Sequence, residues 1–537
     1  MMISAWQRTD TSSFPEDDIA MYRSVRSGEK LLRIVIVLAI LISIAYHAAL
    51  IFRARDFLPD RPFRDDAFYA FTVSRNIAIG RGITTADGSI PTNGIQPLFV
   101  LITTLPFIIT SDKFTALRWI HGFHLFFHCL GALAIARLVA DHSRRKLTPY
   151  LAAALWMVSY NMLKLCSNGL ETGFYLLFLV VVCRAYLRSV LPETRKPGAN
   201  LLFGVLLGLL TLTRIDTGLL CLAMAMHYTV FHRSEGPLNA LWRGPLLWLP
   251  GFLLVTSPWW LYNIHLTGAP FPTSGLVQTM GWMTGGSFDT IEVLNNLWYA
   301  TQSLLDQSLM VVLTPLRLIE HVGSISIAII FAKTALLAVF IVVLRRSRKY
   351  PVDVSLPGLR EFWFYPLFVG FLLIFYIFFF NVEWYMNRYL IPAILIPAFI
   401  LPLILERYRA CYSSLLLISA AAVSILIGGY SYGKRFSPMY TDHWGWVRDN
   451  VEEGTWVAAS QSGTLGYFHD RTINTDGKVN SEIFGLPLAE LAGYLTDRHV
   501  AYFIEWPEVG LFQVQEFQEL FVCIDTIGTC VVYRSVE

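Results

Sequence analysis

Two adjacent carboxylates, Asp65 and Asp66, are the groups in this sequence best suited to proton transfer. They follow the first long apolar segment, residues 31–52, and therefore lie beside the surface of any membrane that this segment enters. Carboxylates at such a place cost free energy unless they are solvated, form ion pairs or serve in binding or catalysis. Near an acceptor hydroxyl, one of them could act as a general base. The simpler alternative is that one acid begins the helix predicted over 67–79 and interacts with its amino-terminal dipole.

The loop that holds the acid pair, residues 53–115, also carries an excess of basic residues, namely Arg53, Arg55, Arg61, Arg64, Arg75, Arg81 and Lys113. Neutralisation of acids in the same loop is the simple explanation. Binding of a phosphate group is the more specific one, because guanidinium groups form paired hydrogen bonds with phosphate oxygens. Arg214 stands two residues before Asp216 at a later boundary between apolar segments. It could face a phosphate or form an ion pair with that aspartate.

The elements that must position these groups follow from the composition. The chain has 537 residues, of which 55% are hydrophobic and only 15% are charged. Because a soluble domain carries about 25% charged residues, the composition predicts a polytopic α-helical membrane protein with enough length left for one soluble domain. The net charge of +3 is too small to indicate a nucleic-acid partner.

Apolar runs predict about eleven transmembrane helices between residues 31 and 430, at 31–52, 116–140, 148–165, 170–188, 201–212, 218–231, 246–262, 324–344, 362–380, 389–405 and 411–430. The segment 98–110 is short and interrupted by Pro106, which favours a helix at the membrane interface, with a short span as the alternative. The fifth and sixth spans are also short and meet at Arg214, as a tight hairpin or a broken helix.

The distribution of Lys and Arg predicts the topology. Alternate short loops are basic, with Arg144, Arg145, Lys146; Arg184, Arg188, Arg195, Lys196; Arg233, Arg243; Arg345, Arg346, Arg348, Lys349; and Arg407, Arg409. Basic loops face the cytoplasm. This places the amino-terminal segment, residues 1–30, in the cytoplasm, and both the acid-pair loop and the carboxyl terminus outside.

Residues 431–537 differ in composition from the rest and predict a small extracytoplasmic α/β domain. Short β-like runs occur at 455–459, 472–475, 500–505, 520–525 and 529–534, with helical patterns at 442–452 and 486–496. Cys523 and Cys530 flank a predicted hairpin turn. The turn could place the two sulfurs opposite each other, so a disulfide is feasible in an oxidising compartment; two unrelated strand cysteines are the alternative.

The acid-pair loop resembles the first extracytoplasmic loop of the GT-C superfamily of membrane glycosyltransferases, which take sugars from polyprenyl-phosphate carriers. Bacterial arabinofuranosyltransferase-like members are the nearest in pattern. The residues that carry this resemblance are Asp65-Asp66-Ala67-Phe68, Ser74-Arg75-Asn76, Gly80, Gly82, Asn93-Gly94 and Pro97-Leu98.

The resemblance implies a transferase of the inner (plasma) membrane that moves a hexose or pentose from a polyprenyl-phosphate donor to a glycan, lipid or protein acceptor of the cell envelope. It favours Asp65 as the base, with Asp66 as an orienting partner, an acceptor ligand or a metal ligand. Arg75, Arg214 and Arg388 would neutralise the donor phosphate. Arg388 stands in an Arg-Tyr-Leu-x-Pro pattern like that of the family, although an interfacial Tyr–Arg anchor is an alternative.

Two further acids follow from weaker matches. Glu171, in Gly169-Leu170-Glu171, corresponds to a Gly-Leu-Glu near the catalytic face of similar proteins, and is a second acid or acceptor ligand, or else a helix cap. Asp476 lies in a run that begins at Gly466-Tyr467-Phe468 and could reach the acceptor cleft, or be an ordinary turn residue. Similar proteins often have Thr-Arg-Pro-Glu where this chain has Thr213-Arg214-Ile215-Asp216, so Ile215 and Asp216 depart from the pattern.

No cofactor is certain from the sequence. Some superfamily members use a divalent cation beside the acid pair, so a cation stays open, but no histidine spacing indicates a metal site. His121, His124 and His128 share about one helical face and are interpreted as packing or interfacial residues. The alternative function is a membrane transporter or lipid-linked-sugar flippase, which would place charges inside the spans; Lys333 is the main such residue.

Overall fold

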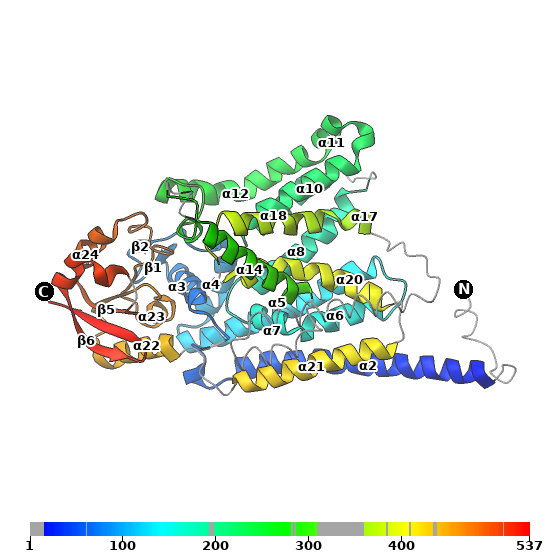
Figure 1. Ribbon diagram of the computed structural model, residues 1–537, viewed down its shortest axis with the longest axis horizontal. Coiled ribbons are helices and arrows are strands. Elements are labelled where there is room, and N and C mark those ends of the chain that lie inside the picture. Colours follow the sequence, from blue (N-terminus) through cyan, green and yellow to red (C-terminus); the bar gives the residue numbers. More distant parts are fainter. Residues whose placement is uncertain are drawn as a thin grey trace.

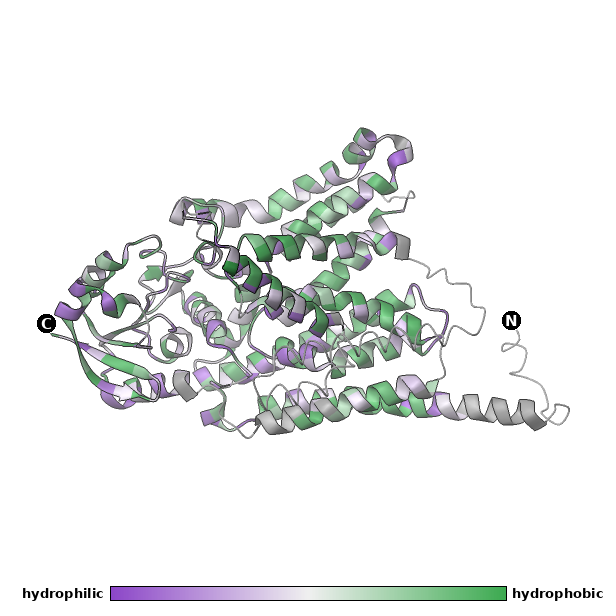
Figure 2. Ribbon diagram, viewed as in Figure 1, coloured by the Kyte–Doolittle hydropathy of each residue, from purple (hydrophilic) through white to green (hydrophobic). Residues whose placement is uncertain are grey.

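The computed structural model describes residues 16–60, 62–192, 198–280, 283, 286–308, 359–382, 385–406, 410–432, 438–507 and 510–536. The predicted span 324–344, with Lys333, lies outside these residues. A bundle of apolar helices forms most of the length of the molecule, and a small sheet covers one end of it (Figure 1). Hydrophobic residues dominate the bundle, and hydrophilic ones are more frequent around the sheet (Figure 2).

The longest apolar runs form the longest helices. Four segments of the described chain are long and apolar enough to cross a membrane, and these are Ser27–Ile51, Lys113–Ala140, Thr172–Val190 and Pro237–Thr267. They belong to α2 (Glu16–Ile51), α5 (Lys113–Ala140), α8 (Thr172–Ala185) with the π-helical turn η4 (Tyr186–Val190), and α11 (Pro237–Arg243) with α12 (Pro245–Thr267). Helix α2 begins at Glu16, well before the apolar run starts.

Shorter apolar helices complete the bundle. They are α4 (Pro97–Ile109), α6 (Thr148–Val158), α9 (Ala199–Thr211), α10 (Gly218–Phe231), α18 (Phe364–Phe378), α20 (Leu395–Leu405) and α21 (Ala410–Tyr432). Helix α12 packs on α9, α21 on α2, and both α6 and α8 on α5. The segments predicted as spans are thus mainly helical among the described residues, while their total of about eleven stays a prediction.

One predicted span is wrong in detail. Residues 148–165 form two helices, α6 and α7 (Tyr160–Cys166), because Ser159 between them has an extended backbone with ψ of 123°. The fifth and sixth predicted spans are the short helices α9 and α10, joined by the 3-10 turn η5 (Ile215–Thr217). His121, His124 and His128 are all buried on α5, and His121 stacks on Phe63 at 3.9 Å between ring centroids, which confirms their packing role.

The acid-pair loop folds at the end of the bundle. It contains η3 (Arg55–Phe57), α3 (Asp65–Ala78), the short antiparallel pair β1 (Thr84–Thr85) and β2 (Ile90–Pro91), and α4. Helix α3 begins at Asp65, and both acids stand in its first turn, where they interact favourably with the helix dipole, but neither makes a capping hydrogen bond. The helix is buried along most of its length and packs on α4.

Several short elements connect the bundle helices. They are η6 (Arg233–Glu235), α13 (Thr273–Leu276), α14 (Thr290–Ser308), α17 (Leu359–Phe362), α19 (Met386–Tyr389) and η10 (Ile391–Ile394). Helix α14 packs on α18 and α19. Helix α19 and η10 precede α20, so the predicted span 389–405 begins with irregular helical turns.

The C-terminal region, residues 438–536, forms a five-stranded mixed sheet in the order β4-β3-β5-β7-β6. Its strands are β3 (Trp456–Ala459), β4 (Thr472–Asn474), β5 (Val500–Glu505), β6 (Phe521–Ile527) and β7 (Cys530–Ser535). Strand β3 pairs in parallel with β4 and β5, and β7 pairs in antiparallel with β5 and β6. All five strands lie within the predicted β-like runs or differ from them by one or two residues.

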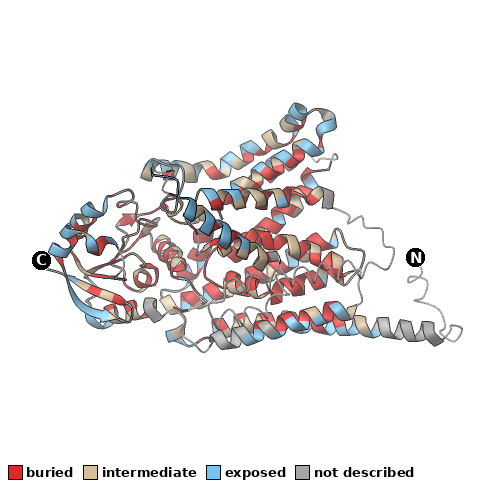
Figure 3. Cartoon of the chain, in the orientation of Figure 1, coloured by how far each residue is buried: buried red, intermediate tan, exposed pale blue. Residues whose placement is uncertain are grey.

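Helices cover both faces of this sheet. Neighbouring residues of β5 point to opposite faces, so Phe503 packs with the core under α24 (Leu488–Asp497), η11 (Gly510–Gln513) and α25 (Gln515–Leu520), and Ile504 packs with the core under α22 (Pro438–Asn450) and α23 (Gly463–Phe468). Helix α23 also packs on α3. Buried residues continue from the bundle into this contact (Figure 3).

The disulfide suggested for Cys523 and Cys530 is not formed. The hairpin turns at Gly528 and Thr529 rather than midway between the cysteines. The register therefore places Cys523 opposite Tyr533 and Cys530 opposite Ile527. Cys523 is exposed and Cys530 is buried, so the two are unrelated strand cysteines.

Candidate functional site

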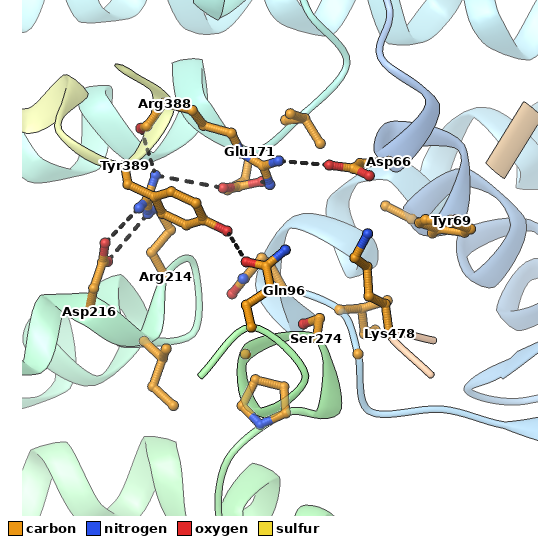
Figure 4. Close-up of a pocket in the computed structure, with 18 of the residues that line it drawn as sticks. Asp66, Tyr69, Gln96, Glu171, Arg214, Asp216, Ser274, Arg388, Tyr389 and Lys478 are labelled. Atoms are coloured by element: carbon orange, nitrogen blue, oxygen red, sulfur yellow. Dashed lines mark hydrogen bonds and ion pairs between the residues drawn. The ribbon is translucent and has the colours of Figure 1, made fainter. Parts of the chain in front are cut away.

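A cavity lies where the acid-pair loop, the ends of the bundle helices and the C-terminal region meet (Figure 4). Its charged lining consists of three carboxylates and three cations, namely Asp66, Glu171, Asp216, Arg214, Arg388 and Lys478. Tyr69, Gln96, Ser274, Gln278 and Tyr389 add polar groups, and Phe99, Leu170, Phe375 and Phe380 are among its apolar residues. The cavity thus combines a polar interior with apolar walls contributed by the bundle.

Arg388 links two acids of the cavity. Its Nη1 lies 3.0 Å from Oδ2 of Asp66, and its Nη2 lies 3.9 Å from Oε2 of Glu171. Asp66 comes from the first turn of α3, Glu171 precedes α8 and Arg388 lies in α19. The Nε of Arg388 is buried and has no hydrogen-bond partner among the described residues. Arg388 could therefore accept a further anionic group.

Arg214 is held by a second, tighter ion pair. Its Nη2 lies 2.6 Å and its Nε 3.3 Å from the two carboxylate oxygens of Asp216. Its Nη1 donates to the backbone carbonyl of Arg388 and lies 4.0 Å from Glu171. The ion pair weighed as an alternative is thus present, and it fixes Arg214 within the cavity wall. Glu171, weighed as a helix cap, makes no capping hydrogen bond and faces the arginines instead.

The two acids of the pair have different surroundings. Asp65 is 6% exposed and does not line the cavity. Its carboxylate accepts the backbone N–H groups of Gly463, at 3.0 Å, and Thr464, at 2.7 Å, both at the start of α23. Burial raises the pKa of Asp65 to about 6, although these two N–H groups favour the charged form. Asp65 thereby joins α3 to the C-terminal region, while Asp66 faces the cavity.

Tyr69, one helical turn after Asp65, strengthens this junction. Its hydroxyl donates to the carbonyl of Ser460 and accepts hydrogen bonds from the Ser462 N–H and the Asn474 amide. Burial raises the pKa of Tyr69 well above its usual value, so the hydroxyl keeps its proton. Tyr69 also lines the cavity, and it therefore couples the C-terminal region to the cavity wall.

Lys478 is a cavity residue that the sequence analysis did not single out. Gly477, with φ of +74°, and the Asp476 carboxylate, which accepts the Lys478 backbone N–H, form the turn that carries it. Its ammonium lies 3.0 Å from the Asp476 carboxylate. Burial alone would lower the pKa of Lys478, but the carboxylates of Asp476 and Asp66 raise it above its usual value. A lysine after an Asp-Gly turn was the only signal in the sequence.

Besides Asp65, two predicted site residues lie outside the cavity lining. Asp476 does not line the cavity itself but forms an ion pair with Lys478, which does. Arg75 lies 2.8 Å from Asp470 of the C-terminal region and donates to the carbonyl of Tyr467. Lys113, at 2.9 Å, and Arg81, at 3.6 Å, approach the same Asp470 carboxylate. These basic loop residues therefore bind the C-terminal region, which explains part of the basic excess of the loop.

The lining does not fit a divalent cation. Among the described residues, no group of three or more His, Cys, Asp or Glu side chains is arranged to hold a metal ion. A guanidinium group, that of Arg388, lies between Asp66 and Glu171, where a cation bridging these acids would stand. The arrangement instead offers a carboxylate base beside cations, which suits proton removal from a hydroxyl next to a bound anion.

Comparisons with known proteins bear on the fold. A model of a domain of unknown function, DUF8728, matches residues 433–532. No curated protein matches the chain in sequence. The crystal structure of ArnT from Cupriavidus metallidurans bound to undecaprenyl phosphate has a TM-score of 0.56 and 12% identity, over 93% of this chain and 97% of ArnT.

Two other solved structures show weaker likeness. The arabinofuranosyltransferase AftD from Mycobacteria has a TM-score of 0.44 and 13% identity, over 94% of this chain and 40% of AftD. The archaeal oligosaccharyltransferase AglB from Archaeoglobus fulgidus, in complex with an inhibitory peptide and a dolichol-phosphate, has a TM-score of 0.43 and 13% identity, over 88% of this chain and 69% of AglB. The match to ArnT shows a shared fold along nearly all of both chains, and it bears out the fold that the resemblance of the acid-pair loop implied.

Proposed function

We propose that this chain is an integral-membrane glycosyltransferase that moves a monosaccharide from a polyprenyl-phosphate carrier to an acceptor hydroxyl. One observation carries the proposal: Asp66 and Arg388 lie together in a cavity at the end of an apolar helix bundle. A carrier of this kind has a long apolar chain and a phosphate, so such a boundary suits both of its parts. The fold shared with ArnT, whose crystal structure holds undecaprenyl phosphate, supports this donor class.

Asp66 is the base in this proposal. It lines the cavity, whereas the Asp65 carboxylate is occupied by two backbone N–H groups of the C-terminal region. Asp66 takes the proton of the acceptor hydroxyl as the acceptor oxygen bonds to the anomeric carbon. The bond from that carbon to the phosphate oxygen breaks, and the carrier phosphate leaves with the electron pair.

Arg388 and Arg214 stabilise the departing phosphate in this proposal. Arg388 now pairs with Asp66, so a phosphate that binds Arg388 would draw the guanidinium away and leave Asp66 able to accept a proton. The Nε of Arg388, without a partner among the described residues, gives the phosphate an immediate donor. Arg214 is less adaptable, because Asp216 holds it in two hydrogen bonds. Lys478 adds a third cation from the C-terminal region.

The topology and acceptor class follow from the sequence. We propose that the amino terminus is cytoplasmic and that the cavity and residues 431–537 face the extracytoplasmic side of the plasma membrane. The acceptor is then a glycan, lipid or protein of the cell envelope, and the C-terminal region helps to select it. The sugar is a hexose or a pentose.

The experiment compares transfer by purified wild-type protein and Asp66→Asn in detergent, with a polyprenyl-phosphate sugar and extracted envelope material, read by mass spectrometry. We expect the product mass with wild type and a loss of at least about 10²-fold with Asp66→Asn, since general bases contribute 10²–10⁴. Asp87→Asn is the matched control, because Asp87 lies in the same loop but pairs with Arg471 outside the cavity.

Two outcomes would overturn the proposal. Unchanged transfer with Asp66→Asn removes Asp66 from the chemistry. In the second outcome, folded wild-type protein gives no transfer with any donor in detergent, yet it moves a lipid-linked sugar across the bilayer of a vesicle. That result would establish the transporter or flippase alternative, since transport requires two compartments and transfer does not.

A further inference from the structure

A second cavity lies at the opposite end of the bundle, between α5 and α8. Its lining residues are Ala134, Arg137, Val180, Val181, Arg184, Ala185, Arg188 and Ser189. Helix α5 runs from Lys113, near the first cavity, to Ala140, and α8 begins just after Glu171 and continues through η4 to Val190. Glu171 lines the first cavity and Arg184 lines the second, so the two cavities are separated along α8 by roughly 20 Å at 1.5 Å per residue.

The charges of the second cavity do not cancel. Three of its lining residues are arginines, and the acid within their reach is Asp141, which follows α5. Arg184 Nε lies 2.8 Å from the Asp141 carboxylate, and Arg188 contacts its other oxygen. Burial alone would raise the pKa of Asp141, but Arg188 and Arg184 lower it, so the carboxylate is charged. The backbone carbonyl of Arg137 accepts the Asp141 N–H, but the Arg137 side chain makes no hydrogen bond or ion pair among the described residues.

Asp141 orients two of the arginines without neutralising the positive charge of all three. Its side chain is 10% exposed, whereas those of Arg184 and Arg188 are 40% and 58% exposed. Arg184 and Arg188 are four residues apart on one helix face, and Arg137 faces them from α5, four residues before Asp141. The shared acid therefore orients two guanidinium groups, and a surplus of positive charge remains beside the cavity.

The remaining walls are apolar and small. Ala134 lies on α5, Val180, Val181 and Ala185 lie on α8, and Val181 is exposed on the outside of the bundle. A cationic rim at the end of two apolar helices, above an apolar groove, matches a molecule with an anionic head and a hydrocarbon tail. Basic pockets between membrane helices bind lipid headgroups in this way.

We propose that this second cavity binds an anionic phospholipid, with its phosphate on Arg137 and Arg188 and an acyl chain along Ala134 and Val181. Positive charge on the cytoplasmic side is expected in any membrane protein, but a general excess requires neither a cavity nor an acid that orients two arginines. The inference goes beyond the proposed function and involves none of the residues assigned to sugar transfer.

The test is native mass spectrometry of the full chain, purified in a neutral detergent and titrated with phosphatidylglycerol or phosphatidylcholine. We expect wild type to retain one phosphatidylglycerol in preference to phosphatidylcholine. The double variant Arg137→Gln/Arg188→Gln should bind phosphatidylglycerol about 25-fold more weakly, since each basic residue near an anionic lipid contributes roughly fivefold. Arg137→Lys/Arg188→Lys should keep most of the affinity.

Arg243→Gln is the matched control, because Arg243 ends α11 at the same end of the bundle but does not line the cavity. A loss with Arg243→Gln as large as with the double variant would indicate a general surface effect and overturn the site. Equal binding of the two lipids by wild type would also overturn it. Displacement of the lipid by millimolar inorganic phosphate would overturn the lipid assignment, since the acyl chain would then contribute nothing. Circular dichroism and gel filtration of every variant would confirm folding.

Discussion

The two ends of the helix bundle differ in how their arginines are buried and paired with acids. In the first cavity, three carboxylates accompany three cations, and the side chains of Arg214 and Glu171 are only 4% and 5% exposed. In the second cavity, two of the three arginines, Arg184 and Arg188, share Asp141, and Arg188 is 58% exposed. Buried charges must be matched by partners, whereas exposed ones are solvated. The first end therefore has charges in defined positions, and the second has charge in surplus.

The C-terminal region accounts for much of this difference. It covers the first end, where α23 packs on α3, Asp470 binds three basic residues and Lys478 enters the cavity. The C-terminal region excludes water from the first end of the bundle, and electrostatic interactions become stronger where water is excluded. A domain placed over one end of the bundle thus turns ordinary surface charges into a matched, buried set.

The largest expected effect comes from breaking the matched set at Arg388. Arg388→Gln leaves Asp66 and Glu171 without their shared cation, which should destabilise the protein by about 3 kcal/mol and lower sugar transfer by at least about 10²-fold. Unfolding in detergent and single-turnover transfer would measure the two effects. Arg188→Gln makes the same chemical change at the exposed end and should alter neither. Equal effects of the two variants would show that the proposed contrast is wrong.

The next effect concerns the contact between α23 and α3. A Cβ at Gly463 would overlap the backbone carbonyl oxygen of Asp65 and lie 2.9 Å from its carboxylate. Gly463→Ala should therefore separate the C-terminal region from α3, lower stability by about 2 kcal/mol or more and abolish most transfer. Limited proteolysis should cleave between the bundle and the C-terminal region.

The control for this variant is Gly493→Ala. Gly493 lies within α24, where no neighbouring atom stands within 4 Å of an added Cβ. Alanine in a helix interior stabilises by up to about 1 kcal/mol relative to glycine, so this variant should be neutral or slightly more stable. A destabilised Gly493→Ala, or an unaffected Gly463→Ala, would contradict the packing described for α23.

Asp65 should make stability depend on pH in a particular direction. Its pKa of about 6 in the folded protein lies above 3.8, so the folded state binds this proton more tightly than the unfolded chain does. Its contribution to stability is therefore largest below about pH 4 and declines as the pH rises to about 6, by about 3 kcal/mol.

The measurement compares the unfolding free energies of wild type and Asp65→Asn between pH 4 and pH 7. Asparagine does not titrate, so the difference between the two proteins should change across this range. Wild type should lose stability relative to the variant as the pH rises. A difference that stays constant, or that changes in the opposite sense, would contradict the buried environment of Asp65.

The smallest effect is expected at Asp141. Asp141→Asn removes the shared partner of two largely solvated arginines, so the cost in stability should be at most about 1 kcal/mol, with no change in sugar transfer. Phosphatidylglycerol binding should weaken, because Asp141 no longer orients Arg184 and Arg188, even though the local positive charge rises. Unchanged or stronger lipid binding would contradict the orienting role of Asp141.

Secondary structure was largely predictable because it depends on local patterns. The runs 500–505 and 529–534 predicted β5 and β7, and the short apolar segments 201–212 and 218–231 predicted α9 and α10. The break at Ser159 was missed, since both of its flanking segments are apolar and no proline or glycine marks it. The position of the hairpin turn was also missed, although Gly528, with φ of +59°, marks it; the bulge between Cys523 and Asp525 lies farther along β6.

The candidate site was only partly predictable. Residue types singled out Asp66 and Arg214, the resemblance to GT-C proteins added Glu171 and Arg388, and the structure brings these four into one cavity. Arg75 was equally plausible as a phosphate ligand, but its partner Asp470 is almost four hundred residues away in sequence. Lys478 had no distinguishing pattern, because its role depends on where a turn of the C-terminal region is placed.

The sequence by itself determined the apolar helices and the mixed α/β region after them, and it showed that the loop of residues 53–115 carries unusual charge. Hydropathy and periodicity are properties of short sequence segments, so they can be recognised without knowledge of the tertiary structure. Only the tertiary structure decided which acid of the pair faces the cavity. Successive residues of a helix point about 100° apart, so Asp65 and Asp66 cannot face the same way. The contact of Gly463 and Thr464 with Asp65 leaves Asp66 beside Arg388.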